Sequence, residues 1–175
     1  FYQLEWDQTV VDNCGTFFAS DVGADGCNDR FAVQGKDINA DGSTAGPSSP
    51  GYRYVGRAGD QDAHGSGQYG IALRWFSPEL NDTEFGFYTM NYHSRAPIAS
   101  YIAGQGVYGT QDPVTGELYA KYFLEYPEDI RLHGVSFATN VGSTAVNGEL
   151  SYRPNMPMQI NTTDLTLASV AQFGS

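Results

Sequence analysis

Residues Gln68–Arg95 read QYGIALRWFSPELNDTEFGFYTMNYHSR and hold two aromatic-rich runs, separated by a short turn of Pro, Asn and Asp. Apolar and polar residues alternate within the runs, as in a β-strand whose successive side chains point to opposite faces. Aromatic residues near the ends of the runs, with so short a turn, are typical of a hairpin in a transmembrane β-barrel. A soluble β-sandwich can contain such a hairpin too, so the rest of the chain has to decide.

Similar patterns predict five strands in the chain. They cover residues 1–10, 68–76, 84–93, 129–139 and 145–152. Lengths of roughly 8 to 11 residues fit tilted membrane-crossing strands, which need about 9–11, and exceed the mode of about 5–6 in soluble proteins.

The connections between these strands alternate in length. Those at 11–67 and 94–128 are long, whereas those at 77–83 and 140–144 are short. This asymmetry is expected when one end of a barrel carries external loops and the other carries tight turns. The sequence therefore predicts an all-β fold: antiparallel up-and-down strands over residues 1–175, forming one segment of a transmembrane β-barrel with long external loops. Since even small barrels need about 8 strands, we expect the chain to be a piece of a longer protein.

Composition agrees with β structure and excludes two classes of protein. The chain has 12 Tyr, 10 Phe and 21 Gly residues, and this enrichment favours sheets over a helical bundle. The net charge of −11 argues against nucleic acid as a partner, because phosphate contacts need clustered Lys and Arg. No apolar run approaches the length of about 18 residues that a transmembrane helix requires.

The two cysteines, Cys14 and Cys27, flank a polar, Gly-rich stretch. We predict that they form a disulfide, which would stabilise such a loop by about 3 kcal/mol in the simple chain-entropy model and would indicate an extracytoplasmic location. Two free buried thiols are the alternative. A metal site is disfavoured because no His or further Cys lies nearby at ligand spacing.

Residues 37–42 match the first half of a calcium-binding loop, D-x-N-x-D-G. Asp37, Asn39 and Asp41 supply oxygens at alternating positions, and Gly42 permits the sharp turn. The twelfth position is Ser48 instead of the bidentate Glu. The sequence therefore predicts either a plain Asp/Asn/Gly turn or a weak calcium site, and we expect no other cofactor.

Charged and polar residues of the predicted strands are candidates for the barrel lumen, with a solvated sheet face of a soluble protein as the alternative. The candidates are Glu5, Arg74, His93, Arg131, His133, Glu149 and Arg153. Leu4, Leu73 and Leu150 are expected to face lipid. The scattered histidines lack zinc spacing, and no G-x-S-x-G motif is present. We therefore expect no enzyme.

Several blocks resemble the DUF1302 family of Gram-negative outer-membrane proteins. The most specific are PELNDTEFGFY at 78–88, YPEDIRL at 126–132 and SYRPNMP at 151–157. The resemblance implies a β-barrel in the outer membrane with extracellular loops, and a role in moving hydrophobic small molecules across that membrane. The partners expected are lipid and lipopolysaccharide, hydrophobic small molecules, and the rest of the barrel or partner subunits. A soluble extracellular β module that binds a ligand or calcium is the alternative.

Overall fold

The computed structural model describes residues 1–9, 21–24, 26–27, 29–35, 40–43, 45–46, 48–49, 51–104, 112, 114–115 and 117–170. The fold is mostly β, with two sheets in two compact units. Unit 1 comprises Phe1–Gln8, Asp62–Ala96 and Tyr126–Met158, and unit 2 comprises Thr9–Gln61, Pro97–Glu125 and Gln159–Ser175. Each unit is described by itself.

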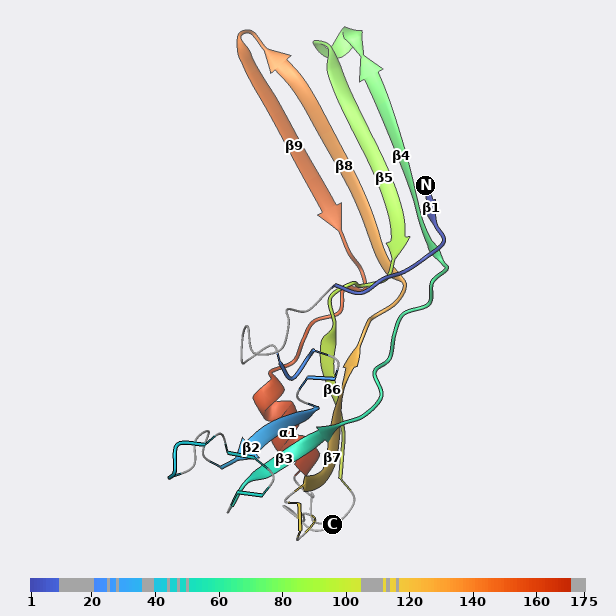
Figure 1. Cartoon of the computed structure of the whole chain (residues 1–175). Coiled ribbons are helices and arrows are strands. Elements are labelled where there is room, and N and C mark those ends of the chain that lie inside the picture. The colour runs from blue at the N-terminus through green and yellow to red at the C-terminus, as the bar shows by residue number, and fades with distance from the viewer. Residues whose placement is uncertain are drawn as a thin grey trace. The chain divides into compact units, whose positions relative to one another are not determined.

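Unit 1 is an open, half-barrel sheet with the order β1-β4-β5-β8-β9, all neighbours antiparallel (Figure 1). The strands are β1 (Tyr2–Gln3), β4 (Gln68–Ser77), β5 (Thr83–Tyr92), β8 (Ile130–Val141) and β9 (Thr144–Tyr152). The four long strands confirm the predicted ones within two residues at each end. The first strand is far shorter than predicted, because β1 pairs with β4 only through Tyr2 and Gln3.

Two tight turns lie at one end of this sheet (Figure 1). The 3-10 turn η1 (Pro78–Leu80) joins β4 to β5 and ends at Asn81 and Asp82, both in the left-handed region at φ 56° and 54°. Asn and Asp tolerate that region better than other non-glycine residues. Gly142, at φ 63°, serves the turn between β8 and β9. Both short connections that the sequence predicts are therefore present.

The long connections all leave from the opposite end of the sheet. We call this end the loop end. The chain passes from one unit to the other at 8/9, 61/62, 96/97, 125/126 and 158/159. The strand directions show that each of these connections joins β1, β4, β5, β8 or β9 at its loop end. Residues 11–67 and 94–128 are more than loops, which corrects the sequence analysis. They contain β2 (Arg30–Gln34), β3 (Arg53–Arg57), β6 (Ile98–Ile102) and β7 (Glu117–Glu125).

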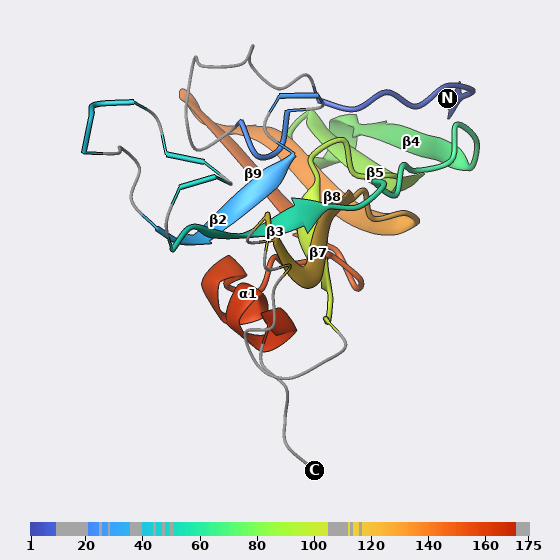
Figure 2. The ribbon, with the colours of Figure 1, turned by 60° about the horizontal axis from the view of Figure 1, so that its bottom comes forward.

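Unit 2 is built on a four-stranded sheet with the order β2-β3-β7-β6, in which β3 and β7 are parallel. The helix α1 (Thr162–Val170) lies beside this sheet (Figure 2). A small core gathers Val55, Leu118, Ala120 and Tyr122, with Val170 of α1 packed against it. Nothing helical in the described part of the chain has the length and hydrophobicity that a membrane crossing requires.

Candidate functional site

The strand register sorts the side chains of unit 1 into two faces of opposite character. Leu73, Phe87, Val135 and Leu150 are paired in turn across β4, β5, β8 and β9, so they form one row on a single face. We call this the apolar face. It includes Tyr69, Ile71, Leu73, Trp75, Phe85, Phe87, Val135, Phe137, Val146, Leu150 and Tyr152, with Thr89, Asn91, Arg131 and His133 at the loop end.

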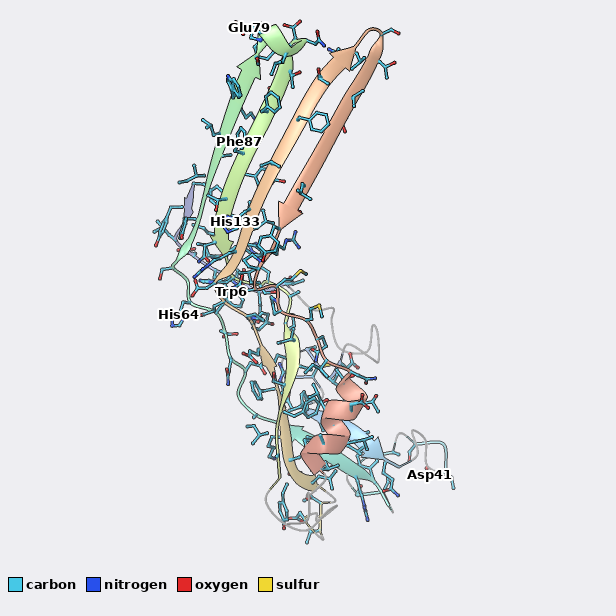
Figure 3. The ribbon with its side chains drawn as sticks, turned by 180° about the vertical axis from the view of Figure 1, so that it is seen from behind. Trp6, Asp41, His64, Glu79, Phe87 and His133 are labelled. Carbon is cyan, nitrogen blue, oxygen red and sulfur yellow. The ribbon has the colours of Figure 1, made fainter. Side chains whose placement is uncertain are left out.

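The bulky side chains of the apolar face are uncovered. Leu73 is 63% exposed, Leu150 is 71% exposed and Ile71 is 67% exposed, although each belongs to a well-paired strand. Figure 3 shows Phe87 and His133 along the same sheet. A contiguous apolar surface of this kind marks an interaction site or a membrane contact, because leaving it in water is costly.

Aromatic rings lie toward both ends of the apolar face. At the turn end Trp75 stacks on Phe85, with ring centroids 5.5 Å apart. At the loop end are Tyr69 and Tyr152, both exposed. Trp75 lies six positions after Tyr69 in β4, so the two ring levels are about 20 Å apart along the strand. Membrane barrels carry such girdles at both edges of an apolar band about 25 Å tall.

The opposite surface, the polar face, holds the adjacent row Arg74, Gly86, Ser136 and Glu149. Arg74 lies 3.7 Å from Glu84, which is on the same face. Toward the turns, most of the other side chains on the polar face are small or polar, and Phe76 and Tyr88 are its aromatic residues. The remaining residues at that level are Ala72, Gly134, Ala138, Asn140, Ala145, Asn147 and Ser151.

Glycines make room for larger neighbours on the polar face. A Cβ on Gly134 would collide with the Tyr88 ring, and one on Gly86 would collide with Ser136 Oγ. Glycine inside a strand often marks a sharp bend or a close approach. Small side chains on one face and bulky ones on the other suit a sheet that curls toward the polar face.

A network of polar groups closes the loop end of unit 1. The buried ring of His93 approaches Ser66 O through Nε2 (2.8 Å), and its Nδ1 accepts a hydrogen bond from Asp129 N (3.1 Å). The Asn91 amide donates to Asp129 Oδ1 (2.7 Å), and Asn155 contacts Asp129 O and Arg131 N. Asp129 itself sits at φ 55°. These contacts give YPEDIRL and SYRPNMP a structural role that the sequence analysis missed.

Two further contacts hold the same end of unit 1. The Trp6 ring meets Tyr126 edge to face, with centroids 4.9 Å apart, and Trp6 Nε1 donates to Ser94 O (3.1 Å). Glu128 accepts hydrogen bonds from the His64 backbone N–H and approaches its ring, each at 2.5 Å. These contacts, the backbone N–H first, lower the pKa of Glu128 from its usual value.

The predicted lumen residues do not share one face. Arg74 and Glu149 lie on the polar face, whereas Arg131 and His133 lie on the apolar face, opposite the place where the sequence analysis grouped them. His93 is buried in the network at the loop end. The reason is that β8 changes character along its length. Near the loop end its apolar residues Ile130 and Leu132 are buried on the polar face, so their neighbours Arg131 and His133 fall on the apolar face.

Like His93, three further predicted residues lie outside the long strands. Glu5 and Leu4 follow β1 and are exposed. Arg153 follows β9, and its Nη1 lies 3.7 Å from Met156 Sδ. Leu73 and Leu150 share the apolar face, as the alternation predicts.

The calcium and disulfide predictions fall partly outside the described residues. Asp37, Asn39 and Cys14 lie there, so both predictions stay predictions. Asp41 is described, and its Oδ1 accepts hydrogen bonds from Ser43 Oγ (2.6 Å) and Ser43 N (3.0 Å). The hydroxyl contact, followed by the backbone one, lowers the pKa of Asp41. Within the described ranges no three His, Cys, Asp or Glu side chains group as metal ligands.

Unit 2 contains a buried charge cluster that the sequence analysis missed. The Arg57 side chain is 6% exposed and pairs with Asp60 at 2.5 Å and Asp29 at 3.6 Å. It also donates to Ala24 O (3.1 Å), so the guanidinium joins the turn before β2 to the strand β3. Nearby, burial raises the pKa of Tyr122 to about 12, and its hydroxyl donates to Val22 O (2.8 Å). The partners already present give this cluster a structural role.

Comparison with known proteins assigns a family to the chain. No curated protein matches it, and no solved structure does. The family described as "Protein of unknown function (DUF1302)" matches residues 1–175. The chain therefore belongs to the DUF1302 family.

Proposed function

We propose that unit 1 is a segment of an outer-membrane β-barrel that provides passage for hydrophobic small molecules across the outer membrane of a Gram-negative bacterium. The observation that carries the proposal is that adjacent rows of side chains across the sheet differ in polarity. Leu73, Phe87, Val135 and Leu150 form an exposed apolar row, whereas the next row contains Arg74 and Glu149. Membrane barrels alternate in this way between lipid and lumen.

In this proposal the apolar face contacts lipid and the polar face lines the passage. An Arg or Glu in contact with hydrocarbon would be costly, and the polar face keeps Arg74, Glu84 and Glu149 away from it. Small side chains on the polar face suit the concave side of a curved sheet. Among the described residues, no strand pairs with the outer edge of β4 beyond Gly70 or with the outer edge of β9. A membrane would require further strands there, because unpaired backbone groups are not tolerated in lipid.

Unit 2 takes the place of the external loops in this proposal. All five crossings of the chain between units lie at the end of the sheet opposite the tight turns. In outer-membrane barrels the long connections are extracellular and the short turns are periplasmic. We therefore propose that unit 2 is a folded extracellular element that gathers apolar compounds for the passage.

Cysteine accessibility in liposomes tests the membrane assignment. Single cysteines would replace Leu73 or Arg74 in a protein whose Cys14 and Cys27 are serine, and a water-soluble thiol reagent would be added. We expect labelling at position 74 and protection at position 73. Equal labelling of the two positions would refute the assignment of β4 as a membrane strand.

Passage itself needs a separate measurement. Uptake of a fluorescent apolar probe by cells that carry the protein should change with Arg74→Leu and Glu149→Gln, which alter the proposed lining. It should not change with the conservative variant Leu73→Ile on the other face. Uptake that is independent of the protein would leave the barrel without a transport role.

A soluble module is the second candidate, and one observation favours it. Two shallow grooves, of about 420 Å³ and about 560 Å³, lie against residues of the apolar face. If that face lined the inside of a soluble barrel, the grooves would hold an apolar ligand. This candidate predicts that the protein stays monodisperse without detergent.

A further inference from the structure

We propose that the loop end of the apolar face binds an anionic membrane lipid, whose phosphate contacts Arg131 and His133 while its acyl chains cover Leu73 and Leu150. This inference rests on the proposed function, since it requires the apolar face to meet lipid. It goes further by assigning a charge preference and a headgroup position to that surface.

The first support is the separation of charge between the two faces. The chain has 20 Asp and Glu residues and a net charge of −11. In the four long strands, however, both carboxylates, Glu84 and Glu149, lie on the polar face. In those strands the charged residue of the apolar face is Arg131, and His133 lies two residues farther along the same face. The charge of the apolar face is therefore opposite in sign to that of the protein as a whole.

The second support is that Arg131 is available. Its side chain is exposed, and none of the ion pairs found within 4.0 Å among the described residues involves it. Asp129 precedes β8 and is the nearest carboxylate along the chain, but its Oδ1 accepts a hydrogen bond from the Asn91 amide. By contrast, Arg74 on the polar face has Glu84 beside it at 3.7 Å.

The third support is the groove that continues from His133 toward the turns. It measures about 420 Å³, and its walls include Ile71, Leu73, Phe87 and Leu150. His133 lies at its polar end, where His133 Nδ1 is 2.9 Å from Thr89 Oγ1. A shallow apolar groove that ends in the hydrogen-bonding groups of Thr89 and His133, with Arg131 two residues farther along the same face, fits an acyl chain with an anionic headgroup.

The level of these groups along the strand also fits a headgroup. Arg131 is paired with Asn91, and Asn91 with Tyr69, so all three lie in one row at the loop end. Tyr and cationic residues prefer the membrane interface, where ring and charge meet headgroups. Arg131 lies four residues before Val135 in the same strand, so the phosphate level is about 13 Å from the middle of the apolar face.

The test is native mass spectrometry of the purified protein in non-ionic detergent micelles. The micelles would contain phosphatidylglycerol or phosphatidylcholine with identical acyl chains, and the bound lipid would be counted. We expect the protein to retain phosphatidylglycerol preferentially. The double variant R131Q/H133Q should lose roughly fivefold or more of that preference, since one cationic residue near an anionic surface contributes about 1 kcal/mol.

Arg74→Gln is the matched control, because it removes the same charge from the polar face. It should leave the lipid preference unchanged. Circular dichroism would verify that each variant keeps its sheet, and both arginines are exposed. Competition with inorganic phosphate separates a lipid site from a simple anion site, because free phosphate should not displace the lipid at equal concentration.

Two kinds of failure can be told apart. Equal retention of both lipids, or an unchanged preference in R131Q/H133Q, would overturn the proposed lipid site and leave the barrel proposal standing. A protein that retains neither lipid and stays monodisperse without detergent would overturn both. Displacement by inorganic phosphate alone would reduce the site to an anion site without acyl contacts, and that result also counts against the inference.

Discussion

The hydroxyl of Tyr88 in β5 donates a hydrogen bond to the carboxylate of Glu149 in β9, and the Tyr88 ring passes over Gly134 in the strand between them. One side chain thus joins three strands on the polar face. The contact depends on the missing Cβ at Gly134, since any side chain there would meet the ring.

Gly134→Val should therefore destabilise unit 1. The new side chain displaces the Tyr88 ring, and overpacking of this kind typically lowers the free energy of unfolding by about 1–3 kcal/mol. Urea unfolding followed by tryptophan fluorescence would measure it. Val135→Ile, one residue along and on the apolar face, is the control and should change little. Equal stability of Gly134→Val and the wild type would show that the ring moves aside freely.

Leu73→Arg and Arg74→Leu should have opposite consequences, although the residues are neighbours. An Arg at a lipid-facing midplane position costs about 2–4 kcal/mol, so Leu73→Arg should impair assembly into liposomes. Arg74→Leu should assemble normally and alter passage. Assembly yield on a heat-modifiability gel gives the answer, and normal assembly of Leu73→Arg would contradict the lipid-facing position.

Cys14 and Cys27 should be joined by a disulfide. Their Cα atoms should then be about 4.4–6.8 Å apart. Thiol labelling of the unreduced, denatured protein should leave both unmodified, and prior reduction should expose both. Full labelling without reduction would exclude the bond.

Calcium should bind weakly or not at all at residues 37–42. Asp41 is already engaged by Ser43, and the twelfth position lacks a Glu, so an affinity no tighter than about millimolar is expected, as in extracellular modules. Calorimetry would compare the wild type with a variant carrying Asp37→Ala and Asp41→Ala. Identical heats of calcium addition for the two proteins would show that residues 37–42 do not bind calcium.

Tyr122 should make unit 2 sensitive to alkali. Burial raises its pKa from 10.0 to about 12, so the folded protein keeps the phenol proton when the unfolded chain has released it. The stability that Tyr122 contributes is therefore complete below pH 10 and is lost as the pH rises toward 12. Tyr122→Phe should be less stable at pH 8, because the bond to Val22 is missing, but its stability should fall less between pH 10 and 12. If the free energy of unfolding fell equally for the wild type and Tyr122→Phe between pH 10 and 12, this prediction would be refuted.

The four long strands could be predicted because their side chains alternate over 9 or more residues. The three short strands of unit 2 could not, for a physical reason. β2, β3 and β6 have five residues each, and their partners lie far away in sequence, as when Tyr54 pairs with Glu117. A short strand whose pattern is completed only by distant neighbours carries little local signal.

The faces of β8 were harder to predict than its existence. Near the loop end Ile130 and Leu132 are buried, while Arg131 and His133 are exposed. Farther along, Val135 and Phe137 are the exposed apolar residues, on the same side as His133. The side that is apolar thus changes within a single strand. The pairing of β8 with β5 and β9 reveals this change. The alternation of apolar and polar residues within a single strand does not, because that pattern is interpreted as if each face were apolar or polar over its whole length.

The five crossings between the units make the sheet of unit 2 a structure of distant segments, unlike the hairpins of unit 1. The partners of β3 include β7, and Val170 packs on the same core, so the core of unit 2 joins residues that are more than 100 positions apart in sequence, such as Val55 and Val170. The hairpins β4–β5 and β8–β9 close locally. Pairings between distant segments form slowly. Until β7 and α1 are available, β2 and β3 can pair only with each other, so unit 2 should complete its sheet later than the two hairpins of unit 1 close.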